Sequence, residues 1–112
     1  MNLAIGFYFA VLASTLPSAA ATIDSSTLNT GEALLQTHCS RCHAIGKDGA
    51  SSHEKAPPFR TVMERYPAEN LAEALAEGIV SGHPDMPEFV FKTGEIDAII
   101  NYLNSLKPPA KP

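Results

Sequence analysis

The sequence of 112 residues has no tryptophan, only two cysteines and few aromatic residues, 7% in all. Two cysteines allow at most one disulfide, which excludes the disulfide frameworks of small secreted scaffolds. Positive charge is also scarce, with eight Lys and Arg against twelve Asp and Glu. A net charge of −4 is opposite to the basic surface that binds nucleic acid, so nucleic acid is not expected as a partner. The apolar fraction of 45% fits one ordinary globular domain.

Long hydrophobic runs are limited to one uncharged stretch at the N-terminus, residues 3–16. A bilayer-spanning helix needs about 20 apolar residues, so this run is too short. Small side chains follow it, which is typical of a cleaved export signal. We therefore expect residues 1–21 to be a signal peptide cut after Ala20 or Ala21, and the protein to be periplasmic or otherwise exported. A retained anchor is the alternative, but no permanent membrane anchor is expected because the run would span poorly.

The remaining chain divides into a flexible leader (22–30), one domain (31–107) and a short tail (108–112). A domain of this size buries only about 60–65% of its unfolded surface, so its core is marginal. Something other than side chains is therefore expected to complete the core.

Apolar residues three or four apart predict helices, and no sustained alternation predicts a sheet. Asn29 or Thr30 is expected to cap a first helix that runs into residues 38–43. A loop over residues 45–58 should precede a short helical stretch at 59–66.

A helix is expected to begin at Pro67 and to stop at residues 81–82, with Leu71, Leu75 and Ile79 on its apolar side. A loop over residues 83–92 follows. Thr93 is expected to cap the last helix, which ends before Pro108. Its apolar residues are Ile96, Ile99, Ile100, Leu103 and Leu106. The fold class is therefore all-α.

The most specific motif is Cys39-Ser40-Arg41-Cys42-His43. Cys-x-x-Cys-His is the attachment signal for c-type haem. A helical turn places both sulfurs on one face, where they match the two vinyl groups of one porphyrin edge, and His43 then faces the iron. We expect one covalent haem c, with thioethers from Cys39 and Cys42 and with His43 as the proximal iron ligand.

A haem-free thiol or metal module is the competing interpretation of the two cysteines. A closed zinc site needs four ligands, and His38, His53 and His83 do not supply the spacing. A thioredoxin-like centre needs a βαβ pattern, which the sequence lacks. His38 and His53 are interpreted as surface residues.

The second iron ligand is expected from a methionine. Met1 is lost with the signal, and Met63 lies in a helical pattern where methionine usually fills the core. Met86 lies in a loop between Pro84 and Pro87, which restrict the backbone and could hold a thioether over the ring. His83, three residues earlier, is the rival ligand.

From Gly31 to Leu106 the sequence resembles the class I monohaem c-type cytochromes, especially the small soluble ones of bacteria. Gly31 and Leu35 stand where that family places a glycine and an aromatic on the first helix. Ile99 and Tyr102 stand where the last helix of the family crosses it. Leu35 departs from the usual Phe, which costs contact area only.

The resemblance implies a cytochrome c fold, in which N- and C-terminal helices cross and short helices and loops wrap one haem. It also implies that the Pro57 carbonyl accepts a hydrogen bond from His43, and that Met86 is the distal ligand. Such an acceptor fixes the ring and raises its basicity.

Iron held by His43 and Met86 has no open position, so we expect a one-electron carrier and not an enzyme. It would serve a respiratory or dehydrogenase-linked chain and dock briefly with redox partner proteins at an exposed haem edge. A haem-based sensor or weak peroxidase with a labile Met86 is the alternative. Residues expected to form the apolar surroundings of the haem are Phe59, Leu71, Leu75, Ile79, Phe89 and Ile99.

The charge distribution is uneven, because residues 22–66 carry five charges of each sign and residues 67–112 carry three positive and seven negative. Glu69, Glu73 and Glu77 recur every four residues, which predicts an acidic helix face that is either solvated or a docking surface. A small group of lysines could surround the haem edge, namely Lys47, Lys55 and Lys92.

Overall fold

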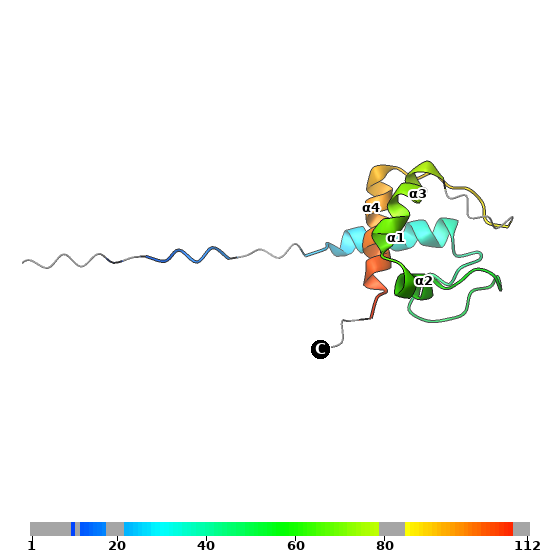
Figure 1. The fold of residues 1–112 in the computed structure, drawn as a ribbon, viewed down its shortest axis with the longest axis horizontal. Coiled ribbons are helices and arrows are strands. Elements are labelled where there is room, and N and C mark those ends of the chain that lie inside the picture. The colour runs from blue at the N-terminus through cyan, green and yellow to red at the C-terminus, as the bar shows by residue number, and fades with distance from the viewer. Residues whose placement is uncertain (1–9, 11, 18–21, 79–84, 109–112) are drawn as a thin grey trace, which may run out of the picture.

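The computed structural model describes residues 10, 12–17, 22–78 and 85–108, and this part of the chain contains helices and no strand (Figure 1). The all-α expectation is confirmed. The elements in chain order are α1 (Ser25–His38), α2 (Phe59–Arg65), the 3₁₀ helix η1 (Ala68–Leu71), α3 (Ala72–Glu77) and α4 (Thr93–Ser105).

The first and last helices, α1 and α4, cross and pack together (Figure 1). The crossing is close because Gly31 has no side chain: a Cβ there would lie 2.1 Å from the Ala98 carbonyl oxygen and 2.8 Å from the Tyr102 Cβ. The expected role of Gly31 and the expected contact with Tyr102 are therefore confirmed. The closest approach to Gly31 is made by Ala98, which was not among the expected contacts.

The hydrophobic core lies along this crossing and under η1 and α3. Leu35 of α1 is 3% exposed and Ile99 of α4 is 1% exposed. The remaining buried members of the core are Met63, Ala68, Leu75, Phe91, Ile96, Tyr102, Leu103 and Leu106. Leu35 therefore fills its place in the core although it is smaller than the usual aromatic.

The expected N-terminal caps were wrong at both long helices. Helix α1 begins at Ser25 with Asp24 as its cap, so residues 25–30 of the expected leader are helical. A polar side chain there hydrogen-bonds to the helix backbone, since the Thr30 hydroxyl donates to the Ser26 carbonyl at 2.9 Å. In α4 the cap is Lys92 and Thr93 is already helical; the Lys92 N–H donates to the Glu95 carboxylate at 2.8 Å.

The helix expected from Pro67 to residues 81–82 is shorter and divided. Pro67 is the cap of η1 and not its first residue, and α3 ends at Glu77. Gly78, with φ of +97°, leaves the helical conformation there, so the expected stop at Ser81–Gly82 was wrong. Ile79 and residues 81–82 lie outside the described residues. The expected loops are confirmed where they are described, at residues 45–58 and 85–92.

Most of the expected signal peptide, including Ala20 and Ala21, also lies outside the described residues. Residues 10 and 12–17 are exposed and not helical. In the part of the chain that is described, no helix has the length and apolar character needed to cross a membrane.

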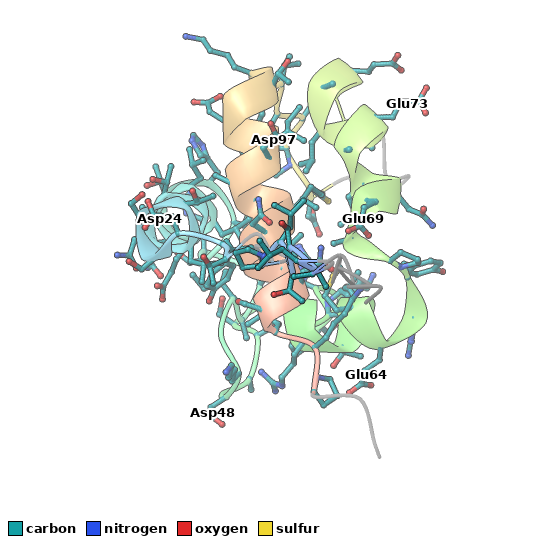
Figure 2. The ribbon with its side chains drawn as sticks, turned by 90° about the vertical axis from the view of Figure 1, so that its left-hand side faces the viewer. Asp24, Asp48, Glu64, Glu69, Glu73 and Asp97 are labelled. Carbon is teal, nitrogen blue, oxygen red and sulfur yellow. The ribbon has the colours of Figure 1, made fainter. Side chains whose placement is uncertain are left out.

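Acidic residues are distributed over several elements, as Figure 2 shows for Asp24, Asp48, Glu64, Glu69, Glu73 and Asp97. The expected acidic face begins in η1 with Glu69 and continues in α3 with Glu73 and Glu77, all of them exposed. The Asn104 amide donates to the Glu69 carboxylate at 2.7 Å, and this bond lowers the pKa of Glu69. Glu69 thus links η1 to α4.

Candidate functional site

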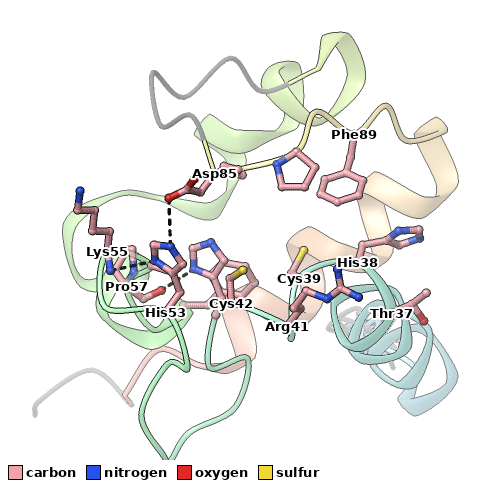
Figure 3. A pocket seen from close by; sticks show the side chains of 15 residues that line it. Thr37, His38, Cys39, Arg41, Cys42, His53, Lys55, Pro57, Asp85 and Phe89 are labelled. Carbon is pink, nitrogen blue, oxygen red and sulfur yellow. Dashed lines mark hydrogen bonds and ion pairs between the residues drawn. The ribbon is translucent and has the colours of Figure 1, made fainter.

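A pocket of about 480 Å³ lies between the segment after α1 and the segment before α4. This volume is in the range of about 300–1,000 Å³ found for pockets that enclose small molecules. Figure 3 shows Cys39, Cys42 and His53 on one wall and Asp85 and Phe89 on the facing wall. The full lining is Thr37, His38, Cys39, Arg41, Cys42, His43, His53, Lys55, Ala56, Pro57, Phe59, Asp85, Met86, Pro87 and Phe89. All five expected site residues are among them.

The Cys-x-x-Cys-His motif forms a single turn directly after α1. Cys39 is the C-cap residue of that helix. The N–H groups of Cys42 and His43 both donate to the Cys39 carbonyl, at 3.2 and 3.0 Å. The helix end and this turn together bring three chemically active side chains to one pocket.

Both cysteines are free thiols. Burial raises the pKa of the Cys39 thiol to about 11, so this group is protonated at neutral pH. Cysteines that act in thiol exchange have a lowered pKa, because the thiolate is the reactive form. The environment of Cys39 therefore disfavours the thiol-module interpretation of the motif.

His43 is held by a backbone carbonyl and by an aromatic ring. Its Nδ1–H donates to the Pro57 carbonyl at 2.8 Å, which is the hydrogen bond that the family resemblance implies. The ring stacks on Phe59 with centroids 4.7 Å apart. Because Nδ1 carries the proton, the Nε2 lone pair of the neutral ring is free to bind a metal.

The two methionines of the described residues have different surroundings. Met86 is half-buried and lines the pocket. Met63 of α2 is 5% exposed, belongs to the hydrophobic core and is not among the residues that line the pocket. Met86 is therefore the better placed thioether, in line with the expectation. The rival ligand His83 lies outside the described residues.

The expected apolar surroundings divide between the pocket and the core. Phe59 and Phe89 line the pocket. Leu75 and Ile99 are core residues, and Leu71 packs against the core. These three residues therefore pack between the helices and do not line the pocket. Ile79 lies outside the described residues.

His38 is exposed, as expected of a surface residue, and His53 is partly exposed. Both line the pocket. His38 packs edge-on against Phe89 and Phe91, with ring centroids 5.4 and 5.3 Å away. His53 faces Asp85, with Nε2 and Oδ2 separated by 3.3 Å. No local pattern indicates these contacts, because each joins residues that are distant in the sequence.

Fold and pocket together define a class of protein: a small all-α domain that gathers two thiols, an oriented imidazole and a thioether at one apolar cavity. A family model described as Cytochrome c matches residues 28–107. The chain therefore belongs to the cytochrome c family. Searches of curated proteins and of solved structures return no match.

Membership of this family makes the chain a haem-binding electron-transfer protein whose cofactor is haem c with its iron. The residues that line the pocket fit that group. Two thiols suit thioether attachment, and the hydrogen bond to Pro57 leaves the coordinating nitrogen of His43 available. When bound, the haem supplies a reversible one-electron couple.

Proposed function

We propose that the protein is a periplasmic one-electron carrier, with Cys39 and Cys42 as the thioether residues and His43 and Met86 as the iron ligands. The observation that carries the proposal is that all four side chains line one cavity, and that His43 there is fixed by Pro57 at 2.8 Å. Two protein ligands leave no position for a substrate, which distinguishes electron transfer from catalysis.

The residues around the ligands keep the site nearly unchanged between oxidation states. The Pro57 carbonyl and the Phe59 ring restrict rotation of the His43 imidazole. Pro87 restricts the backbone beside Met86. The aromatic rings of Phe59 and Phe89 contribute apolar surface to the pocket, and apolar surroundings disfavour the more highly charged ferric state. The expected result is a raised reduction potential.

Location and partners are supported by the sequence and by the rim of the pocket. The uncharged run at residues 3–16 supports export. Haem-containing protein should therefore be recovered in the periplasmic fraction of cells that express the full chain. Its recovery in the cytoplasmic fraction would contradict the location.

Arg41 and Lys55 line the pocket and are exposed, which supports brief docking of redox partner proteins beside them.

The ligand assignment is tested by Met86→Ala, with Met63→Leu as the control. Met86→Ala should keep the haem through acid–acetone extraction, lose the far-red methionine-to-iron band of the ferric protein and bind carbon monoxide. Its potential should fall by on the order of 0.2 V, within the roughly 0.8 V range that axial ligands span. Met63→Leu should retain both band and potential, because Met63 lies in the core.

An unchanged spectrum in Met86→Ala would assign the ligand to another residue and contradict the proposal. Carbon monoxide binding by the unaltered protein at neutral pH would instead favour the sensor or peroxidase alternative, in which Met86 is labile. Redox titration of the absorption spectrum measures ligation and potential together.

A further inference from the structure

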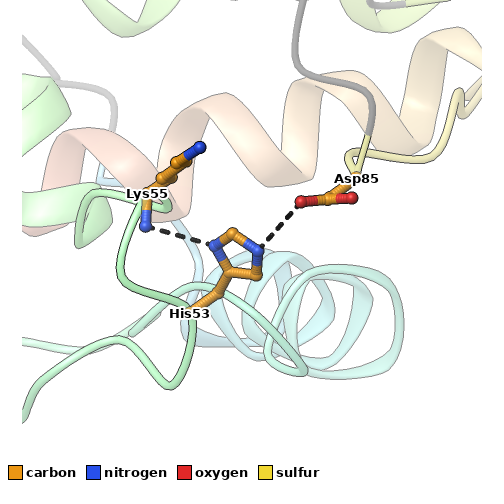
Figure 4. Close-up of polar contacts among 3 residues, drawn as sticks. All are labelled: His53, Lys55 and Asp85. Carbon is orange, nitrogen blue, oxygen red and sulfur yellow. Dashed lines mark hydrogen bonds and ion pairs between the residues drawn. The ribbon is translucent and has the colours of Figure 1, made fainter.

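His53 and Asp85 meet at the pocket and connect its two walls (Figure 4). The His53 Nε2 lies 3.3 Å from the Asp85 Oδ2. His53 belongs to the loop at residues 45–58, and Asp85 belongs to the segment that leads into α4. We call this contact the His53–Asp85 clasp.

The orientation of the His53 ring is set within its own loop. The Lys55 backbone N–H donates to the His53 Nδ1 at 3.2 Å, so Nδ1 acts as an acceptor and carries no proton. The proton of the neutral ring is then on Nε2, which faces the Asp85 carboxylate. The ring therefore presents its Nε2–H side to the Asp85 carboxylate, 3.3 Å away, in an orientation that the Lys55 backbone N–H helps to set.

On its other side, His53 is tied to the haem-attachment motif. Its backbone N–H donates to the Cys42 carbonyl at 3.2 Å, and its own carbonyl accepts the Ala56 N–H at 3.0 Å. Ala56 precedes Pro57, whose carbonyl orients His43. His53 is thus hydrogen-bonded to the same stretch of backbone that orients the His43 ring.

The segment with Met86 is anchored at its far end by other contacts. The Phe91 N–H donates to the Leu75 carbonyl at 2.9 Å, and Phe89 packs against His38. At the near end, the described contacts include the clasp, which holds the residue directly before Met86. The Glu88 side chain also lies against Gly78, but Glu88 follows Met86, whereas the clasp holds the residue before it.

We propose that His53 is a positioning residue for Met86, acting through Asp85 to hold the methionine segment against the wall that carries His43. The proposal rests on the proposed function, since it requires Met86 to be an iron ligand. Asp85 is 69% exposed and His53 33%, so solvent weakens the bond. An exposed contact of this kind corresponds to a change of about two- to fivefold in the occupancy of the methionine-bound state.

Two substitutions at His53 separate the clasp from the local fold of the loop. In His53→Asn the side-chain oxygen can still accept the Lys55 N–H, but the chain is too short to reach Asp85. In His53→Gln the amide nitrogen takes the place of Nε2 and can donate to Asp85. The probe is cyanide, which competes with Met86 for the ferric iron, together with the far-red methionine band.

His53→Asn and Asp85→Asn should each raise cyanide affinity about two- to fivefold and weaken the methionine band, whereas His53→Gln should stay within twofold of the unaltered protein. The double variant His53→Asn/Asp85→Asn should show no more than the larger single effect, because both changes remove one interaction. Wild-type behaviour of His53→Asn, equal effects of Asn and Gln at position 53, or additive effects in the double variant would overturn the proposal.

The two proposals fail in different ways. If the unaltered protein shows the methionine band and His53→Asn keeps it with unchanged cyanide affinity, Met86 is the ligand but His53 does not position it. If the unaltered protein lacks the band and Met86→Ala changes nothing, both proposals are overturned.

Discussion

Single side chains attach the loop at residues 45–58 to the rest of the molecule at both of its ends. The Tyr102 hydroxyl donates to the Ile45 carbonyl at 3.0 Å. At the other end the His43 Nδ1–H donates to the Pro57 carbonyl at 2.8 Å. One bond comes from α4 and the other from the Cys-x-x-Cys-His turn. The loop is therefore fixed by two elements from opposite ends of the domain.

Replacing Tyr102 by Phe tests the first of these bonds. Loss of a partly buried hydroxyl bond should lower the free energy of unfolding by about 1 kcal/mol at neutral pH, measured by denaturant unfolding of the haem-bound protein. Burial, followed by the nearby negative charge of Glu32, raises the pKa of Tyr102.

A folded-state pKa above the unfolded value means that this group's contribution is fully present below about pH 10 and is lost as the pH rises further. Tyr102→Phe should therefore unfold less steeply with pH above about 10 than the unaltered protein. Parallel alkaline curves for the two proteins would show that the Tyr102 hydroxyl has no part in the pH dependence.

The site residues that could be predicted from the sequence are those whose chemistry depends on local spacing. Cys39, Cys42 and His43 share one turn, so their spacing alone places them together. Asp85 and His53 could not be paired in this way, because their contact depends on how two distant loops meet. Nothing in the residues next to His53 in the sequence distinguishes it from an ordinary exposed histidine.

At the scale of elements, the contact between α1 and α4 depends on the absence of a side chain at Gly31. A Cβ there would overlap the Ala98 backbone, which cannot move without shifting α4. Gly31→Ala should therefore lower the free energy of unfolding by about 1–3 kcal/mol, the usual cost of overpacking.

The matched control is Gly94→Ala. Gly94 lies in α4, and a Cβ added there would meet no atom within 4 Å. Since alanine is the better helix former, this change should leave the free energy of unfolding unchanged or raise it by up to about 1 kcal/mol. Equal destabilisation by the two changes, measured by thermal or denaturant unfolding, would contradict the close-packing explanation.

Helix existence was easier to predict than helix ends, for a physical reason. The apolar spacing in α4 places the apolar residues on one buried face. That face is the same whether the helix begins one residue earlier or later. The ends depend on weaker local bonds, such as that of the Lys92 N–H to Glu95. The early end of α3 at Gly78 depends on one backbone angle, which apolar spacing does not report.

At the scale of the whole molecule, the domain is small and has a pocket of about 480 Å³ beside its hydrophobic core. The haem therefore takes the place of core side chains, and the small domain is expected to depend on it. Cys39 and Cys42 are the only two cysteines of the sequence, and both are proposed to attach the haem, so none would be left for a disulfide.

Blocking attachment tests this dependence. Cys39→Ser/Cys42→Ser expressed in an exporting host should lose about half or more of its helical circular dichroism at 25 °C and bind no haem covalently. Ser40→Ala, which changes a neighbouring residue and keeps the motif, should retain both. Full helicity in the haem-free double variant would show that the side chains alone complete the core.

The crossing of α1 and α4 also governs the order in which the domain can form. Helix α1 is synthesised before α4, so Gly31 is made well before Ala98 and Tyr102, against which it packs. A contact between such distant segments carries a large loop-closure cost and forms late. The crossing cannot form until α4 has been made. The turn that carries Cys39 and Cys42, directly after α1, is therefore made before the helix crossing behind it can form.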